Sequence, residues 1–256
     1  MTEAEGVAAL KAAGVEGAIR DAQLLWAAAQ EDAATFEGFI LRRGQHREPV
    51  SRILQRRAFW DHDFLVTPDV LDPRPDTETL VEEALKTPWN TVLDLGTGSG
   101  CIILSLLAAR GETKGTATDI SDKALHTAQA NAERLGLLDR VVFTPSNWFE
   151  NVQGPFDLIV SNPPYITAAA FAALHPEVQR HDPKIALTPG GDGLDAYRII
   201  CAQAPDYLTP NGHLMVEIGF DQAAPVEALF QAAGFSDIRM IRDINGKPRV
   251  VAAILR

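Results

Sequence analysis

The chain has 256 residues, of which 46% are hydrophobic, and it carries a net charge of −11. This is enough apolar material for one sizeable core and a small second domain, and the acidic charge disfavours a nucleic-acid backbone as the substrate. No apolar run is long enough to cross a membrane, and the acidic start of the chain is unlike a signal peptide. We therefore expect a cytoplasmic monomer that binds neither a membrane nor nucleic acid directly.

Cysteine and histidine are sparse. Cys101 and Cys201 are far apart, and both lie in apolar sequence of helical character. This pattern indicates buried thiols in a reducing compartment rather than a disulfide. The six histidines show no ligand spacing with cysteine or acidic residues, so we expect no metal site.

Residues 1–57 are rich in alanine, with apolar residues at helical spacing and breaks at glycines. This pattern predicts a small helical-bundle domain. Arginines gather toward its end, and they are Arg42, Arg43, Arg47, Arg52, Arg56 and Arg57. They indicate either a solvated basic face or a surface that docks a partner. Residues 58–75 alternate weakly and are expected to form a hairpin or extended linker.

A helix is expected soon after the start of the next part, residues 76–256. It follows the segment Asp72-Pro73-Arg74-Pro75-Asp76-Thr77-Glu78. The prolines stop extended structure, Asp76 or Thr77 can cap the helix, and acidic residues suit its first turn. An ordinary helix start explains most of this segment, but it leaves Arg74, set between two prolines, unexplained.

A buried strand at residues 91–95 runs into a glycine loop and then into an apolar helix. The loop is Gly96-Thr97-Gly98-Ser99-Gly100. Strand, glycine loop and helix begin a nucleotide-binding fold, in which missing Cβ atoms let a ligand approach the backbone. A dinucleotide fold needs its third glycine one place later, where this chain has Cys101. The acidic strand end at Asp94 instead suits a cofactor with a cationic amino-acid end and no phosphates, S-adenosylmethionine.

Two later loops supply further candidates for the cofactor site. Strand 115–118 ends in Asp119, about twenty residues after the glycine loop, where a carboxylate can accept from both ribose hydroxyls. The alternative role of Asp119 is to cap the following helix. Trp148 follows strand 141–143, and it can either form a wall beside the adenine or pack in the core.

A further apolar run, residues 156–160, leads to the tetrapeptide Asn162-Pro163-Pro164-Tyr165. This place corresponds to the carboxyl edge of a parallel sheet, where ligands bind. The prolines restrict the backbone, so the side-chain carbonyl of Asn162 and the backbone carbonyl of Pro163 point to fixed places. Two convergent acceptors suit a planar amino group with two N–H donors, and Tyr165 offers a flat face. The alternative is a structural Asn-Pro turn with a packed tyrosine.

The remaining sequence completes the predicted fold. Residues 167–184 are expected to form a lid or short helices, and buried strands are expected at 213–218, 237–241 and 249–254, the last two joined by an Asn-Gly turn. We predict an α/β protein with a Rossmann-like methyltransferase domain. Its mostly parallel sheet ends in an antiparallel C-terminal hairpin, and a small helical-bundle domain precedes it.

From about Glu48 to the C-terminus the chain resembles the release-factor glutamine methyltransferases, the HemK-type family. The matching motifs are Phe64-x-Val66, Pro73-Arg74-Pro75-Asp76-Thr77-Glu78, Asp94 to Gly100, Asn162-Pro163-Pro164-Tyr165, Gly190-Gly191-x-Gly193-Leu194 and Asp243-x-x-Gly246-x-x-Arg249. Gln55 and Ala58 depart from the Gly and Glu that the family usually shows there, which concerns the linker rather than the chemistry.

The resemblance implies methyl transfer from S-adenosylmethionine to the side-chain amide nitrogen of a glutamine in class I peptide chain release factors. Residues 1–57 would then dock the substrate protein, and residues 76–256 would form the catalytic domain. The implied catalytic residues are Asn162, Pro163 and Tyr165. Pro164 and Arg74 join them as substrate contacts. The implied cofactor contacts are Gly96, Thr97, Gly98, Ser99, Gly100, Asp119, Trp148 and Asn162.

Two other functions fit the same motifs. Methylation of the exocyclic amino group of adenine in DNA or RNA would use the same tetrapeptide, with Tyr165 stacked on a flipped base. A catalytically silent docking protein could retain the fold without the reaction. The acidic composition of the larger domain disfavours the first alternative, and the intact glycine loop and tetrapeptide disfavour the second.

Overall fold

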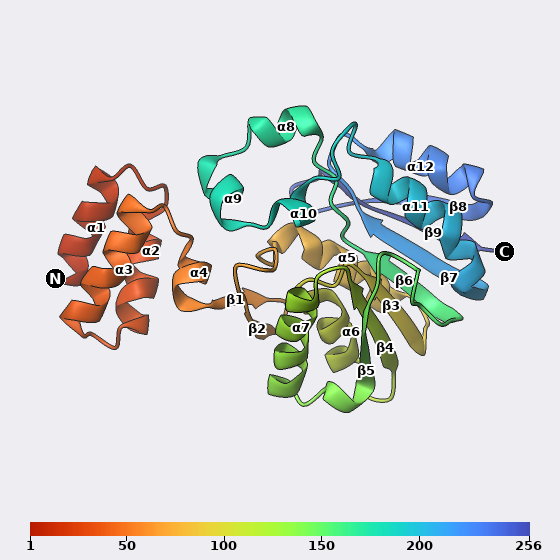
Figure 1. The fold of residues 1–256 in the computed structure, drawn as a ribbon, viewed down its shortest axis with the longest axis horizontal. Coiled ribbons are helices and arrows are strands. Elements are labelled where there is room, and N and C mark those ends of the chain that lie inside the picture. Colours follow the sequence, from red (N-terminus) through yellow and green to blue (C-terminus); the bar gives the residue numbers. More distant parts are fainter.

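The computed structural model describes residues 1–256, except for the side chain of Pro176. The chain begins with a helical domain (Figure 1). Its helices are α1 (Glu3–Ala12), α2 (Ala18–Ala28), α3 (Ala33–Gln45) and α4 (Val50–Leu54). Helix α1 starts at a capping box, in which the side chains of Thr2 and Glu5 each accept from the other's backbone N–H. Asp32 caps α3 by accepting from the Thr35 N–H at 2.8 Å.

The helical domain has an apolar core of its own. Leu25, Phe36 and Ile40 are buried in this core, and Ile53 of α4 belongs to it as well. The helices therefore bury their apolar faces against one another, separately from the clusters that lie under the large sheet.

A hairpin joins the helical domain to the sheet (Figure 1). Its strands, β1 (Arg56–Phe59) and β2 (His62–Leu65), pair antiparallel. Phe59 and Phe64 are buried in the larger core, and their rings meet edge to face with 6.1 Å between centroids. Because β1 starts at Arg56, the hairpin begins slightly before the linker that the sequence predicts.

The remaining strands form one large sheet in the order β5-β4-β3-β6-β7-β9-β8. They are β3 (Thr91–Leu95), β4 (Lys114–Asp119), β5 (Val141–Pro145), β6 (Phe156–Ser161), β7 (Leu208–Glu217), β8 (Phe235–Arg242) and β9 (Pro248–Leu255). Neighbours from β5 to β7 pair parallel, whereas β9 pairs antiparallel with both β7 and β8. The predicted α/β fold, with its antiparallel C-terminal hairpin, is confirmed.

Helices cover both faces of this sheet, because its central strands are apolar on both sides. In β6, Leu158 and Val160 pack with the helices of one face, and Ile159 packs with those of the other. The first face carries α5 (Glu78–Lys86), α6 (Cys101–Ala109) and α7 (Asp122–Arg134), and the second carries α11 (Asp195–Gln203) and α12 (Ala223–Ala232). Short 3₁₀ turns are η1 (Pro75–Thr77), η2 (Leu138–Arg140) and η3 (Ala204–Tyr207).

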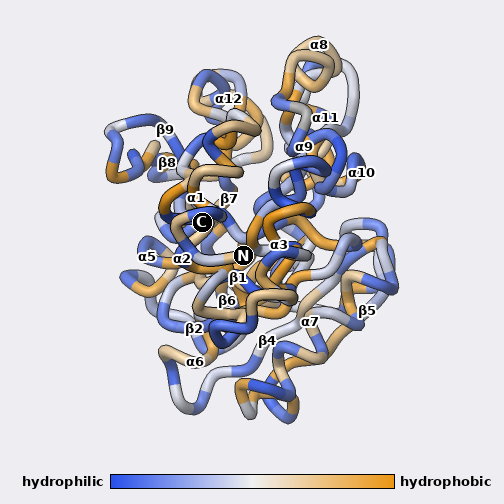
Figure 2. Tube along the Cα trace, turned by 90° about the vertical axis from the view of Figure 1, so that its left-hand side faces the viewer, coloured by the Kyte–Doolittle hydropathy of each residue, from blue (hydrophilic) through white to orange (hydrophobic). Residues whose placement is uncertain are grey.

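A lid segment, residues 167–188, connects β6 toward α11. It contains α8 (Ala168–Ala172), α9 (Pro176–His181) and α10 (Lys184–Leu187). Figures 1 and 2 show these short helices grouped together beside the sheet, and Figure 1 shows α9 on the side toward the helical domain. None of the helices in the described chain is both long and apolar enough to cross a membrane.

Candidate active site

A cavity of about 400 Å³ opens at the carboxyl edge of the parallel strands. Its walls come from the glycine loop after β3, the ends of β4 and β5, the segment after β6, residues 69–77 and the lid. Strands β4, β3 and β6 are neighbours in the sheet, so the loops that follow them meet at one place. The cavity therefore brings together most of the site residues that the sequence predicts.

The glycine loop forms the floor of the cavity. Gly96, Thr97, Gly98 and Ser99 line it. The Thr97 N–H donates to the Thr118 carbonyl at 2.8 Å, which fixes the loop to the end of the neighbouring strand. Backbone atoms are thus held at the cavity surface, where a ligand can approach them closely.

Gly100 does not line the cavity, and a glycine is needed at this position for a different physical reason. Its φ is +80°, and an added Cβ would lie 3.0 Å from Leu104 Cδ1 and 3.2 Å from Ala128 Cβ. A side chain at this position would therefore be strained in backbone and crowded by α7. Gly100 allows α6 to start tightly packed beneath the loop, which is a structural contribution to the predicted cofactor site.

Asp94, at the end of β3, is completely buried beneath the glycine loop. Its Oδ2 accepts from the Thr97 hydroxyl at 2.7 Å, whereas its Oδ1 has no hydrogen-bond partner among the described residues. Burial raises the pKa of Asp94 to about 7, the nearby Asp119 charge adds to the rise, and the Thr97 hydrogen bond opposes it. A buried carboxyl with a spare oxygen favours a cationic ligand nearby.

Asp119, at the end of β4, is positioned by two backbone donors. Its Oδ2 accepts from the Gly98 N–H and its Oδ1 from the Ser121 N–H, both at 2.9 Å. The cap of α7 is Ser121, whose hydroxyl accepts from the Ala124 N–H, so Asp119 is not the helix cap. Each carboxylate oxygen keeps further acceptor capacity toward the cavity, as a ribose diol requires. Burial raises the pKa of Asp119.

Trp148 lies at the boundary between the cavity and the core. It lines the cavity, and it also packs against the core cluster on the α11 side of the sheet. Its backbone is left-handed, with φ of +53°, and its carbonyl accepts from the Ser146 hydroxyl at 2.8 Å. The indole is therefore held by the core at a cavity wall.

The lining residues suit S-adenosylmethionine better than a phosphorylated cofactor. Among the described residues that line the cavity, Arg74 is the one with a cationic side chain, and its guanidinium is bound to Asp182 of the lid. Asp119 places a carboxyl at the cavity wall, Asp94 places another beneath the glycine loop, and Ile120 and Ile185 add exposed apolar walls. A cationic ligand with a flat purine ring fits this lining, whereas a pyrophosphate does not. No group of three or more potential metal ligands occurs in the described chain.

Asn162 follows β6 directly and faces the cavity together with Pro164. The preceding Ser161 is buried and donates its hydroxyl to the Leu95 carbonyl at 2.7 Å, which ties the end of β6 to β3. The Asn162 Nδ2 donates to the Thr77 hydroxyl oxygen at 3.2 Å. Its Oδ1 is thus left as an acceptor, as the two-acceptor interpretation requires. Pro163 is buried and does not line the cavity.

Tyr165 does not line the cavity, contrary to the flat substrate face expected of it. Its ring packs against the core cluster on the α11 side, and its hydroxyl donates to Glu217 Oε1 at 3.3 Å. Its carbonyl accepts from Gln222 Nε2 at 3.0 Å. A Cβ on Gly193 would lie 2.3 Å from that carbonyl oxygen, which explains why a glycine follows in the Gly-Gly-x-Gly motif. The ring anchors the tetrapeptide from behind.

Arg74 and Arg52 converge on Asp182, which follows α9 in the lid. Arg74 Nη2 lies 2.6 Å from Asp182 Oδ2, and Arg52 Nη2 lies 2.8 Å from Asp182 Oδ1. Only 4% of the Arg52 side chain and 5% of the Asp182 side chain are exposed, so this contact is protected from solvent. Arg52 also donates to the carbonyls of Thr67 and Val70. No local sequence pattern indicates this link, because Asp182 lies 130 residues after Arg52 and 108 residues after Arg74.

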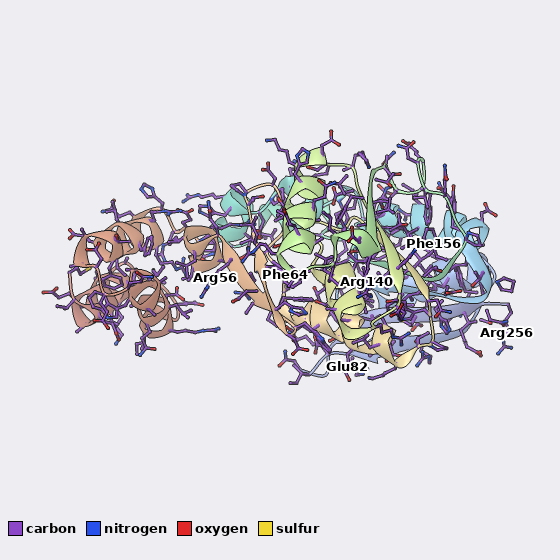
Figure 3. The ribbon with its side chains drawn as sticks, turned by 90° about the horizontal axis from the view of Figure 1, so that it is seen from below. Arg56, Phe64, Glu82, Arg140, Phe156 and Arg256 are labelled. Atoms are coloured by element: carbon purple, nitrogen blue, oxygen red, sulfur yellow. The ribbon has the colours of Figure 1, made fainter. Side chains whose placement is uncertain are left out.

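Most arginines of the helical domain make internal contacts. Arg43 pairs with Asp21 at 2.7 Å and with Glu177 of α9 at 3.0 Å. Arg42 pairs with Glu48, Arg47 donates to the Ala13 and Gly14 carbonyls, and Arg57 donates to the Pro73 carbonyl. Arg56 is exposed on the hairpin (Figure 3). Several of these arginines therefore hold the helical domain, the linker and the lid together, and they do not form one continuous free basic face.

Comparison with known proteins agrees with this geometry. The family model described as "Methyltransferase small domain" matches residues 69–192. A methyltransferase from Pyrococcus furiosus has a similar structure, with a TM-score of 0.57 and 19% identity over 77% of this chain and 90% of that one. This likeness shows a shared fold.

The sequence relatives are much closer. The release factor glutamine methyltransferase of Cereibacter sphaeroides is 47% identical over 96% of this chain and 94% of its own length. The protein of the same name from Rhodospirillum rubrum is 47% identical over 95% of this chain and 81% of its own length. Identity of this extent across nearly the whole chain confirms the resemblance seen in the motifs, and the protein belongs to the family of release factor glutamine methyltransferases.

Proposed function

We propose that the protein transfers the methyl group of S-adenosylmethionine to the side-chain amide nitrogen of a glutamine in a class I peptide chain release factor. One observation carries this proposal: Asn162 turns its Nδ2 toward Thr77, so its Oδ1 remains as an acceptor beside the glycine-loop cavity. A primary amide has two N–H donors on one nitrogen, and two acceptors can hold both of them.

The protein's part in the reaction is to orient an unreactive nitrogen. When bound, S-adenosylmethionine supplies an electrophilic methyl group. The Asn162 Oδ1 would accept one amide N–H group, and the Pro163 carbonyl is proposed to accept the other, although Pro163 does not line the cavity in this structure. Holding both N–H groups fixes the direction of the nitrogen and favours lone-pair character on it as the new C–N bond forms. The amide nitrogen becomes acidic on methylation, so no general base is needed before attack. In this proposal Tyr165 supports the tetrapeptide, and Arg74 positions the lid.

Labelled methyl transfer tests the proposal. The chain is incubated with S-adenosylmethionine labelled in its methyl group and, separately, with an intact class I release factor, the same factor with the target glutamine changed to alanine, and adenine-containing DNA or RNA. We expect label only in the intact factor, located on one glutamine by mass spectrometry. Label in the nucleic acid alone would instead establish the adenine-amino reaction.

The helical domain is proposed to dock the release factor. Its surface, which lies outside the cavity, carries three exposed apolar side chains. They are Ile19 and Leu24 on α2 and Leu41 on α3, and they are 52%, 44% and 48% exposed. Deleting residues 1–57 would be a poor test, because it would also remove Arg43 and Arg52, which bind the lid. Point substitutions avoid this problem.

The docking test compares a whole release factor with a short glutamine peptide. Leu24→Glu and Leu41→Glu should lower methylation of the whole factor and leave the peptide rate unchanged. If the variants methylate the whole factor at the wild-type rate, these helices do not have a docking role. We further propose a monomer that acts in the cytoplasm and does not bind nucleic acid directly, in keeping with a protein substrate and the net charge of −11.

A further inference from the structure

Two loops at the carboxyl edge of the sheet carry exposed apolar side chains that lie outside the cavity. Phe220 follows β7 and is 59% exposed, and Ile244, in the turn between β8 and β9, is 99% exposed. The turn lies at this edge because Ile218, just after β7, donates its N–H to the Arg249 carbonyl of β9 at 2.8 Å. Lys247 Nζ lies 5.5 Å from the centre of the Phe220 ring, so the two loops meet. We call Phe220, Ile244 and Lys247 the turn patch.

The turn that presents Ile244 is held rigidly. The Asp243 side chain is buried, and its Oδ1 accepts from the N–H groups of Asn245 and Lys247 at 2.9 and 3.0 Å. The Asp243 N–H also donates to the Lys247 carbonyl at 2.9 Å. Arg249 binds Asp243 Oδ2 through Nε and Nη2, at 3.2 and 3.1 Å. The turn therefore fixes an isoleucine in water, and burying this side chain against a partner would cost little ordering of the loop.

Both loops are joined to the acceptor side of the cavity. Gln222, in the loop after β7, donates from Nε2 to the Tyr165 carbonyl at 3.0 Å. Arg249, which holds the turn, also pairs with Asp76 at 3.0 Å, and Asp76 belongs to η1, whose Thr77 lines the cavity. Figure 2 shows the β8–β9 hairpin and the lid helices α8 to α10 on opposite sides of the view. The turn patch is therefore continuous with the acceptor side and lies away from the lid.

We propose that the turn patch is a second contact surface for the release factor, where it receives an apolar side chain near the loop that carries the target glutamine. A glutamine side chain is short, so the backbone that carries it must pass close to the rim of the cavity. A folded protein in that position also covers the neighbouring loops. This inference rests on the proposed function.

The chemistry of the turn patch indicates what it binds. Two exposed apolar side chains with a lysine at their edge suit an apolar side chain of the partner that has a carboxylate beside it. A few anchors of this kind can carry most of the binding free energy of an interface. A phosphate backbone would instead need several cations at one place.

The first test separates recognition of the whole factor from the reaction. Ile244→Asp should lower kcat/KM for an intact class I release factor about tenfold or more, mainly through a higher KM. The rate on a short glutamine peptide and the affinity for S-adenosylmethionine should not change, because Ile244 lies outside the cavity. Ile244→Leu keeps an apolar side chain and should retain most of the wild-type kcat/KM. Lys247→Glu should lower kcat/KM by a smaller factor.

Leu138→Asp is the matched control. Leu138 is 48% exposed, but it begins η2, which leads into the amino end of β5 at the opposite edge of the sheet. This variant should methylate the release factor at the wild-type rate. The proposal is overturned if Ile244→Asp keeps the wild-type kcat/KM on the intact factor. It is also overturned if Ile244→Asp loses the peptide reaction equally, or if Leu138→Asp shows the same loss.

Cross-linking provides an independent test. A photoreactive benzophenone amino acid in place of Ile244 should cross-link to the intact release factor, whereas the same group in place of Leu138 should not. Lack of a cross-link at position 244, in a protein that still methylates the factor, would contradict the contact. Absence of release-factor methylation by the wild-type protein would instead overturn the proposed function, so the two failures are distinguishable.

Discussion

The two sides of the cavity are held in different ways. On the cofactor side, backbone N–H groups of the glycine loop bind the end of β4, because Thr97 donates to the Thr118 carbonyl and Gly98 donates to the Asp119 carboxylate. On the acceptor side, Asn162 is fixed by a side chain, Thr77, which comes from a turn 85 residues earlier. The first side is therefore built by the fold itself. The second depends on a side-chain contact between two residues that are far apart in the sequence.

The largest effect is expected from Asn162→Ala, which breaks the acceptor side. Loss of one preorganised acceptor should lower kcat about a hundredfold or more, while cofactor affinity changes much less. Single-turnover kinetics on the release factor would measure this. Asn147→Ala is a matched control, because Asn147 lines the same cavity but bonds only Glu150 at the surface. A wild-type rate in Asn162→Ala would mean that the tetrapeptide is a structural turn.

Asp119→Ala breaks the cofactor side, and its main effect should be on cofactor affinity rather than on kcat. Removing hydrogen bonds to a charged acceptor costs roughly 1.5–3 kcal/mol, or about tenfold to a hundredfold in cofactor affinity. Calorimetry would measure it, with Asp122→Ala in the first turn of α7 as the control. If Asp119→Ala folds and binds cofactor normally, Asp119 serves only to tie the glycine loop to β4.

The pH dependence of cofactor binding sharpens the comparison, because Asp94 belongs to the cofactor side. Its pKa is raised to about 7, so the free protein carries it mostly protonated below that pH. A cationic cofactor favours the ionised form, so affinity should rise with pH, by at most about tenfold per unit, and level off above 7. Titration calorimetry across pH 5.5–8.5, roughly the range in which such a group titrates, would test this. Asp94→Asn should abolish the dependence.

The smallest effect is expected from Tyr165→Phe, which keeps the ring and removes the donor to Glu217. The lost hydrogen bond should lower the free energy of unfolding by about 1 kcal/mol, and KM for the release factor should not change. Chemical denaturation and steady-state kinetics would measure the two quantities. A large increase in KM would indicate that the tyrosine contacts the substrate directly.

The sequence predicted where the residues of the proposed cofactor side lie in the fold, and the reason is physical. Strand, glycine loop, helix and the acidic end of the next strand follow each other closely, so local patterns locate Gly96, Gly98 and Asp119 at one edge of the sheet. Asn162 was also predicted, because an apolar strand leads straight into it. These predictions needed only the alternation and order of elements.

The acceptor side could not be derived in the same way. Thr77 was one of two candidate caps for the helix, although its side chain is buried and accepts from Asn162 Nδ2, and Glu217 fell inside the predicted strand 213–218. The orientation of Tyr165 away from the cavity depends on packing under α11 and α12, which no local pattern encodes. The available signal for Thr77 was its position just after Pro73-Arg74-Pro75. An ordinary helix start explains that segment except for Arg74, so the pattern drew attention to Arg74 and not to Thr77.

The contact of Arg52 and Arg74 with Asp182 has a consequence for protein engineering. The helical domain has its own core, so it looks like a module that could be exchanged between relatives. Yet α4 supplies Arg52 to a carboxylate of the lid, and the same carboxylate holds an arginine at the cavity wall. A chimera that replaces α1 to α4 without preserving this contact would remove one of the two arginines bound to Asp182 and leave Arg74 as the remaining one, so the cost should be a part of the roughly 3–5 kcal/mol that is typical of breaking a buried ion pair. Domain boundaries for such chimeras should therefore fall before α4, so that Arg52 and Asp182 come from the same parent.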